Sequence, residues 1–196
     1  MTDQAGGPTA PRESRKGCLS IGRIFVVLLL LGVVAAAAYF TVLPMLVKHH
    51  PISTAETNAA AALRGYVSAQ VRYRSEDHDG DGKPEYAKPY PLLRDRKGPG
   101  GLPLNLISAG LAAARGADGK PFHGYRFYDA LRLGGKPVDW SRDFGLCASP
   151  AVYGKTGVRT FIVSTDGTVW SKDLGVSEFV KDFPADPAAA GWRAAD

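Results

Sequence analysis

The amino-acid sequence predicts an α+β protein in which helices come first and an antiparallel sheet follows. An uncharged apolar run covers residues 24–47, apolar residues then recur at helical spacing, and short alternating segments with glycine turns fill the C-terminal half. Helices followed by strands, rather than alternating with them, are typical of α+β folds. We expect five regions in the 196-residue chain. They are a disordered cytosolic tail (1–22), a transmembrane helix (23–47), an amphipathic helix (48–76), an α+β outer domain (77–192) and a short tail (193–196).

The apolar run predicts a membrane-spanning helix. At about 1.5 Å per residue it reaches about 36 Å, which exceeds a hydrocarbon core of about 30 Å. Basic residues cluster before it, at Arg12, Arg15, Lys16 and Arg23, whereas Lys48 alone follows it at once. Because positive flanks stay inside, we expect a single-pass protein of the cytoplasmic (inner) membrane whose C-terminal domain is periplasmic. The alternative is a cleavable signal peptide with small residues at 35–38, which would leave apolar residues 39–47 at a new N-terminus.

The two cysteines, Cys18 and Cys147, lie on opposite sides of the apolar run. They cannot form an intramolecular disulfide if that run crosses a membrane, and Cys18 is misplaced for a lipoprotein signal. We interpret Cys147 as a buried small residue, and an intermolecular link is the alternative.

A second helix is predicted to begin near Thr54. Ser53 and Glu56 have the spacing of a capping box, in which each side chain bonds the other residue's backbone N–H. Residues of one face then recur at spacings of three and four: Leu63, Tyr66, Val67, Gln70 and Tyr73. Polar Arg64, Ser68 and Arg72 form the opposite stripe. This pattern is typical of an amphipathic helix.

The remaining elements are predicted from alternation and turn residues. Residues 77–101 are rich in Asp, Gly, Pro and Lys and indicate a long loop, and 105–115 indicate a short helix. Residues 123–133 alternate as a strand before Gly134 and Gly135. Two β-branched runs flank Asp166 and Gly167 within 158–173, which indicates a hairpin. A further strand at 146–152 and a loose C-terminal segment, 183–196, with Trp192 packed down, complete the prediction.

An acidic loop at residues 77–85 is the sharpest chemical signal. Asp77, Asp79 and Asp81 occupy alternate positions before Gly82, as in the first half of an EF-hand calcium loop. The Lys83 carbonyl and the Glu85 side chain would supply further oxygen ligands. Position twelve is Lys88 instead of glutamate, so we expect a weak or structural calcium site. The alternative is a solvated turn in which the aspartates bond local backbone groups.

The sequence gives no positive sign of an enzyme or a nucleic-acid binder. The formal charge is +5, and the basic residues are scattered among acidic ones. The four histidines, His49, His50, His78 and His123, lack a recognisable nucleophile motif, and no phosphate-binding glycine loop occurs. A ligand platform could be formed by Tyr125, Phe127, Tyr128, Phe161 and Trp170, but strand periodicity accounts for most of them as core residues or cross-strand pairs. We therefore expect no catalytic residues, no small-molecule substrate and no nucleic-acid partner.

Several segments together resemble a bacterial group of pilin-like envelope proteins of unassigned function. The resemblance covers most of residues 54–192 and is carried by these segments: 56–64 (ETNAAAALR), 68–74 (SAQVRYR), 77–82 (DHDGDG), 124–127 (GYRF), 153–163 (YGKTGVRTFIV) with Gly167, and 172–175 (KDLG). Members resemble type II secretion pseudopilins and type IV pilins. The resemblance implies an apolar helix continuing into an amphipathic one, an antiparallel sheet and, in some members, a calcium loop.

The chain departs from the pilin processing signal. Gly17 is followed by Cys18, and Gly22 stands where the fifth mature residue would be glutamate. We therefore expect a pilin-like domain on a permanent anchor.

Three functional hypotheses follow. The first is an envelope protein that acts by contact with other envelope proteins or with itself, as a component of a secretion or pilus apparatus or an accessory to it. The second is a cell-surface binding module ordered by calcium. The third is an enzyme, which a deep pocket containing a carboxylate or histidine of strongly shifted pKa would indicate.

Overall fold

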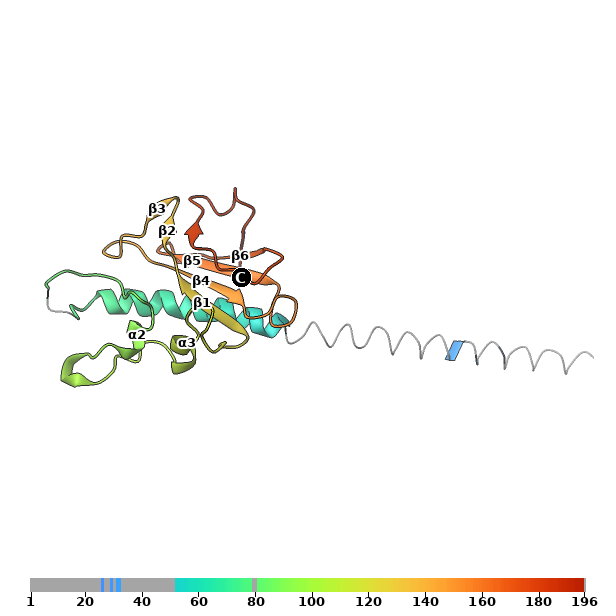
Figure 1. Ribbon diagram of the computed structural model, residues 1–196, viewed down its shortest axis with the longest axis horizontal. Helices are drawn as coiled ribbons and strands as arrows, with labels where there is room; N and C mark the ends of the chain where they lie inside the picture. The colour runs from blue at the N-terminus through green and yellow to red at the C-terminus, as the bar shows by residue number, and fades with distance from the viewer. Residues whose placement is uncertain (1–25, 27–28, 30, 33–51, 79–80, 196) are drawn as a thin grey trace, which may run out of the picture. The chain divides into compact units, whose positions relative to one another are not determined.

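The computed structural model describes residues 26, 29, 31–32, 52–78 and 81–195 of the chain (Figure 1). The chain divides into two compact units, Met1–Val47 and Lys48–Asp196. The four described residues of the first unit are helical and exposed. The rest of the predicted tail and transmembrane helix lies outside the described residues. Within the described ranges no helix has both the length and the apolar character needed to cross a bilayer.

The second unit begins with a long helix, described over residues 52–74 and drawn in turquoise in Figure 1. Its buried face carries Ala59, Ala60, Leu63, Tyr66, Ala69, Gln70 and Tyr73. Arg64, Ser68 and Arg72 are exposed on the other face. The predicted amphipathic helix is therefore confirmed, with its apolar stripe turned toward the protein.

Glu56 does not make the predicted capping box. Its carboxylate accepts hydrogen bonds from the backbone N–H groups of Val158 (3.0 Å) and Arg159 (3.1 Å). The Arg159 Nε also donates to it at 2.8 Å. A buried carboxylate gains more from two backbone amides and a guanidinium than from one amide of its own helix, so the tertiary contact prevails over the local one.

A five-stranded sheet packs on the long helix. Its strands are β1 (Tyr125–Asp129), β4 (Gly145–Pro150), β5 (Arg159–Ser164), β6 (Val169–Asp173) and β8 (Arg193–Ala194). They lie in the order β1-β4-β5-β6-β8, and every neighbouring pair is antiparallel. The predicted hairpin is confirmed as β5 and β6, with Gly167 at φ +76° in the turn, a conformation that favours glycine.

The predicted strand at 123–133 is divided between two sheets. β1 ends at Asp129, and the N–H groups of Leu131 and Arg132 both donate to the Lys181 carbonyl, at 2.8 and 3.0 Å. This contact carries the chain into a three-stranded sheet of β2 (Arg132–Leu133), β3 (Lys136–Pro137) and β7 (Asp182–Phe183). The strand order is β3-β2-β7, with β2 antiparallel to β3 and parallel to β7. The turn predicted at Gly134 and Gly135 is confirmed.

The C-terminal segment is more ordered than predicted. Residues 193 and 194, expected in the tail 193–196, form β8 and pair with β6. The Ala195 N–H donates to the Val169 carbonyl at 2.8 Å, and Arg64 of the long helix donates to the Ala195 carbonyl at 2.7 Å. Trp192 is buried, as predicted. Alanine-rich sequence carries little strand signal, so this pairing depends on the open edge of β6.

Two short helices lie between the long helix and the sheet strands in the chain. α3 (Ala109–Ala113) is capped by the Ser108 hydroxyl, which accepts from the Leu111 N–H. It is shorter than the predicted 105–115. The predicted loop 77–101 contains α2 (Leu92–Asp95) and a 3₁₀ turn, η1 (Pro99–Gly101). In Figure 1 the long helix runs between the sheet and the segment with α2 and α3.

Two clusters of buried side chains lie on the two faces of the large sheet. One joins the long helix to Leu93, Leu111, Phe127, Phe161 and other side chains. The second joins Cys147 and Ile162 of the opposite face to Ala130, Phe183 and Trp192. β2 and β3 lie on that opposite side in Figure 1. The helix thus covers one face, while the small sheet and the C-terminal segment partly cover the other.

Candidate functional site

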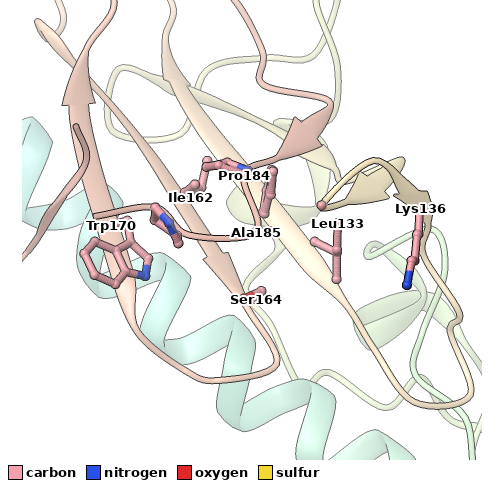
Figure 2. Close-up of a pocket in the computed structure, with 10 residues that line it drawn as sticks. Leu133, Lys136, Ile162, Ser164, Trp170, Pro184 and Ala185 are labelled. Carbon is pink, nitrogen blue, oxygen red and sulfur yellow. The ribbon is translucent and has the colours of Figure 1, made fainter. Parts of the chain in front are cut away.

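A cleft of about 300 Å³ opens between the two sheets, on the face away from the long helix (Figure 2). We call it the Trp170 cleft. Its lining residues come from β5, β6, the β2–β3 turn region and the segment after β7: Leu133, Gly134, Lys136, Ile162, Ser164, Trp170, Phe183, Pro184, Ala185 and Pro187. Most of the lining residues are apolar, but polar and apolar atoms share its surface about equally.

Strand alternation places the floor of the cleft. Successive side chains of a strand point to opposite faces, so Phe161 and Val163 face the long helix while Ile162 and Ser164 face the cleft. In β6, Val169 belongs to the helix-side cluster and Trp170 to the cleft side. Trp170 packs against the second cluster as a partly buried side chain, and it also borders the cleft.

The opposite wall is held by the small sheet. Leu133 of β2 pairs with Phe183 of β7, and the Gly134 N–H donates to the Phe183 carbonyl at 2.7 Å. Gly134 has φ +58°, and a Cβ placed there would lie 3.0 Å from the Ala185 Cβ. Glycine thus permits both the turn and the close approach of the segment after β7.

The polar groups of the Trp170 cleft are mainly donors. The Trp170 Nε1 is buried and donates no hydrogen bond within the described residues. Lys136 is the one charged residue of the lining, and it is exposed. Its ammonium group forms no ion pair with the described residues. The Ser164 hydroxyl donates to an Asp166 carboxylate oxygen at 3.2 Å. The Trp170 Nε1 is therefore covered by the protein, whereas Lys136 is exposed.

A buried carboxylate, Asp129, ends β1 on the helix side of the sheet. One of its oxygens accepts from the Tyr90 N–H at 3.1 Å, and the other lies 3.7 Å from the Arg115 Nε. Burial raises the pKa of Asp129 to about 6, despite the opposing effects of the Tyr90 N–H and of nearby Arg115 and Lys88.

The groups around Asp129 form an internal hydrogen-bond network. The Gln70 Nε2 donates to the Tyr66 hydroxyl at 2.9 Å and to the Ala87 carbonyl at 3.0 Å, and its Oε1 accepts from the Ala87 N–H at 2.8 Å. The Tyr90 hydroxyl donates to the Leu111 carbonyl at 2.9 Å. Burial raises the pKa of Tyr66 and of Tyr90 well above that of an ordinary tyrosine. These groups fasten the long helix to the loop that follows it.

The Trp170 cleft and Asp129 lie on opposite faces of the large sheet. Asp129 shares the alternation of Tyr125 and Phe127, which face the long helix. Among the described residues, the cleft and the carboxylate of raised pKa therefore do not combine into one site.

The predicted calcium loop is described in part. Asp79 and Gly80 lie outside the described residues. Asp77 accepts from the Gly82 N–H at 2.8 Å, and Asp81 accepts from the Lys83 N–H at 2.8 Å. Where the structure describes the chain, it brings no three His, Cys, Asp or Glu side chains into a metal-ligating group. The Glu85 ligand and the Lys83 carbonyl remain predictions, as does calcium.

The remaining candidates are Cys147 and the histidines, and those that the structure describes pack against neighbouring side chains or backbone. Cys147 is buried, burial raises its thiol pKa to about 12, and its sulfur accepts from the Val180 N–H at 3.4 Å. The predicted buried role is confirmed. The His78 ring lies 4.3 Å from the Tyr73 ring. His123 follows Phe122 before β1, whereas His49 and His50 lie outside the described residues.

Sequence reasoning missed the Trp170 cleft. The alternation of side chains along β6 places Trp170 and Val169 on opposite faces of the sheet, and this was the one sign in the sequence that Trp170 lies away from the long helix. One wall of the cleft, however, is formed by residues 182–187. Their strand is short and they include two prolines, so the sequence gives little indication of a strand there.

Comparison with known proteins gives one result. A protein-family match covers residues 45–185, which is most of the chain. Searches of curated proteins and of solved structures find no match. The match agrees with the predicted membership in a group of unassigned function, and its description mentions no pilin. The chain belongs to the family described as "Protein of unknown function (DUF2950)".

Proposed function

We propose that this chain is a membrane-anchored, pilin-like envelope protein that acts by contact with other envelope proteins or with itself. It serves as a component of a secretion or pilus apparatus or as an accessory to one. The observation that carries the proposal is the layout of the chain. An uncharged apolar run, residues 24–47, precedes by a few residues a helix that packs lengthwise on an antiparallel sheet.

The attachment of the helix to the sheet supports this proposal. Glu56 lies near the start of the described helix, and its three hydrogen bonds to Val158 and Arg159 tie that end to β5. At the other end, Arg74 donates to the Ser141 carbonyl at 3.1 and 3.3 Å. A helix fixed at both ends forms one body with the sheet, so the segment that precedes the helix connects to a rigid domain.

The distribution of reactive groups supports contact over catalysis. The carboxylate with raised pKa, Asp129, accepts an internal hydrogen bond and faces the long helix. The Trp170 cleft has an apolar lining with one lysine and no carboxylate or histidine. Lys136 is the one titratable side chain of this lining, and Asp129 lies on the other face of the sheet, so we infer that the cleft is suited to recognition.

Membrane anchoring is tested by extraction of native membranes with alkaline carbonate. We expect the full chain to remain in the membrane pellet, and a chain without residues 1–47 to be released. Protease added to spheroplasts should digest the C-terminal domain and spare an N-terminal tag. Release of the full chain by carbonate would contradict the anchor.

Contact is tested by cross-linking the full chain in intact membranes and identifying every species of shifted mass. We expect a ladder of the chain itself or adducts with envelope proteins. A chain in which residues 24–47 are replaced by an unrelated spanning helix controls for crowding in the membrane and should keep the adducts made by the outer domain. Monomer alone at all cross-linker concentrations would contradict the proposal.

A further inference from the structure

Two adjacent loops of the second unit carry a group of exposed apolar side chains. One loop joins β4 to β5 over residues 151–158, and the other follows β6 over residues 174–177. Val152, Tyr153 and Val176 are between 37% and 46% exposed there. They are half of the six large apolar side chains that are exposed among the described residues of the second unit. Single exposed apolar residues are ordinary, but three on neighbouring loops indicate a contact surface.

Hydrogen bonds hold the two loops together and fix their shape. The Tyr153 N–H donates to the Ser177 hydroxyl at 2.6 Å, and the Tyr153 hydroxyl donates to the Asp173 carboxylate at 3.1 Å. Within the first loop, the Gly154 N–H donates to the Gly157 carbonyl at 2.9 Å. The loops are therefore already ordered, so a partner that binds them does not have to order them.

The loops lie at the end of the domain where the long helix begins. Glu56, in the first turns of the described helix, accepts from the N–H groups of Val158 and Arg159, which end the first loop and begin β5. In Figure 1 the loop that leads into β5 lies beside the start of the described helix. Whatever adjoins the start of the helix therefore also adjoins these loops.

The chain before the helix is a short tether. Only residues 48–51 separate the apolar run, 24–47, from residue 52, where the described helix begins. A fully extended chain spans at most about 3.6 Å per residue, so residue 52 lies within about 18 Å of the end of that run. A headgroup layer is itself about 5–8 Å thick. If the run spans a bilayer, as proposed above, the loops are within reach of the headgroups.

Tyr153 and Lys155 give the loops a composition suited to lipid. Tyrosine is enriched where membranes meet water, because its ring is apolar and its hydroxyl is polar. Lys155, exposed in the same loop, supplies an ammonium group for a lipid phosphate while its stem covers apolar surface. Asp173 and Glu178 flank the second loop, so the surface has no excess of positive charge. Apolar contact is therefore the expected source of binding, and it does not require anionic lipid.

We propose that Val152, Tyr153, Lys155 and Val176 form a surface that rests on the phospholipid headgroups of the membrane in which the chain is anchored. We call it the tip surface. Because the tether is short, the bilayer is present at this surface in every anchored molecule, whereas a protein partner has to be recruited. The inference rests on the proposed anchor, and it goes beyond the proposed contact function because it names a second surface and a different partner.

The test uses the full chain in phosphatidylcholine nanodiscs, with photoreactive benzoylphenylalanine at one position at a time. The position under test is Tyr153. Leu102 is the matched control, since it is 73% exposed but belongs to a segment that Arg96 fastens to His78, beyond the far end of the helix. Leu29, within the apolar run, reports the anchor itself. After illumination, phospholipid adducts are measured by mass spectrometry of the intact chain.

We expect phospholipid adducts at Leu29 and at Tyr153, and about fivefold fewer at Leu102. A variant with about ten Gly and Ser residues inserted after Pro51 separates affinity for lipid from mere closeness to it. A surface with its own affinity should keep at least about half of its Tyr153 adducts on this longer tether.

Substitutions in the tip surface test which side chains carry the contact. Val152→Ser combined with Val176→Ser removes two apolar side chains and should lower the Tyr153 adducts about fivefold. Leu131→Ser changes an exposed apolar residue outside the tip surface and should leave them unchanged. Replacing about a quarter of the lipid with phosphatidylglycerol should change them by less than about twofold, because the surface has no excess of positive charge.

Each failure has a distinct meaning. Adducts at Leu29 with none at Tyr153 would overturn the tip surface and leave the anchor standing. No adduct at Leu29 would overturn the anchor and this proposal with it. Tyr153 adducts that vanish on the longer tether, or that join two chains in place of lipid, would also overturn the proposal. Each variant is first melted, so that loss of adducts is not confused with unfolding.

Discussion

Glu56 joins two segments that lie 103 residues apart in the sequence. Its side chain is 6% exposed, and it accepts two backbone N–H groups and the Arg159 guanidinium. Glu56 stabilises the fold by accepting hydrogen bonds from these donors, because each donor would otherwise be partly buried without a partner. At the scale of single residues, the fold therefore depends on buried polar groups as well as on apolar packing.

Replacing Glu56 tests this dependence. Glu56→Ala removes the acceptor for the Val158 and Arg159 amides and should lower the free energy of unfolding by about 3 kcal/mol. Glu56→Gln keeps one oxygen acceptor and should cost less. The measurement is urea denaturation followed by circular dichroism, and Glu76→Gln, at an exposed residue just after the helix, is the control. Equal stability of the Ala variant and the control would refute the role of Glu56.

Asp129 gives a second residue-scale prediction, in which stability depends on pH. Burial raises the folded-state pKa of Asp129 from 3.8 to about 6. The folded protein therefore binds the proton more tightly than the unfolded chain, and this contribution to stability falls as pH rises from about 4 to about 6. The loss amounts to about 2–3 kcal/mol. Unfolding free energies at pH 4 and pH 7 should show it in the native chain and not in Asp129→Asn.

Asp139 is the control for that experiment. Hydrogen bonds from Ser141 lower its pKa, so its contribution is present at neutral pH and is lost as pH falls. Asp139→Asn should therefore leave the fall between pH 4 and pH 6 intact. If Asp129→Asn keeps the same pH dependence as the native chain, another group is responsible.

At the scale of elements, the sequence predicted the helices and hairpins that form from interactions between residues close together in the chain. The amphipathic helix and the β5–β6 hairpin follow from periodicity and from glycine at a turn that needs positive φ. β7 and β8 have two residues each, and their pairing depends on strands far away in the sequence. For the same reason the Trp170 cleft was not predictable, because β7 and the segment after it form one wall.

The terminal strand β8 can be tested by deletion. A chain that ends at Trp192 loses the pairing with β6 and the Arg64 hydrogen bond to Ala195. Its free energy of unfolding should fall by about 2–4 kcal/mol, since a few backbone hydrogen bonds contribute about 1 kcal/mol each. Hydrogen exchange should accelerate in β6 more than in β4. A loss below about 0.5 kcal/mol would mean that this segment behaves as the tail that the sequence predicted.

The acidic loop gives the remaining element-scale prediction. If calcium binds, the melting temperature of the full chain should rise with calcium and fall with chelator, by an amount that grows with the ratio of calcium to its dissociation constant. Asp81→Asn keeps an acceptor for the Lys83 N–H but removes a ligand charge, so it should reduce the rise. Asp139→Asn is the matched control. Identical melting in millimolar calcium and in chelator would favour the solvated turn.

At the scale of the whole second unit, the large sheet separates two environments. One face is sealed by the long helix and contains the network around Asp129, whereas the other carries the Trp170 cleft. The first maintains the fold, and the second is open to solvent. Substitutions on the helix side should therefore change stability first, and substitutions in the cleft should change binding first.

The pairing of the long helix with distant strands also fixes a sequence of events during synthesis. The apolar face of the helix is complete once residue 74 has been made, but β5 and β6, against which it packs, extend to Asp173. Contacts of such long sequence separation form late. Leu93, Leu111 and Phe127 can cover part of that face earlier, but its cover is incomplete until about one hundred more residues have been made. During that interval the newly made helix is a segment that a holding chaperone would meet.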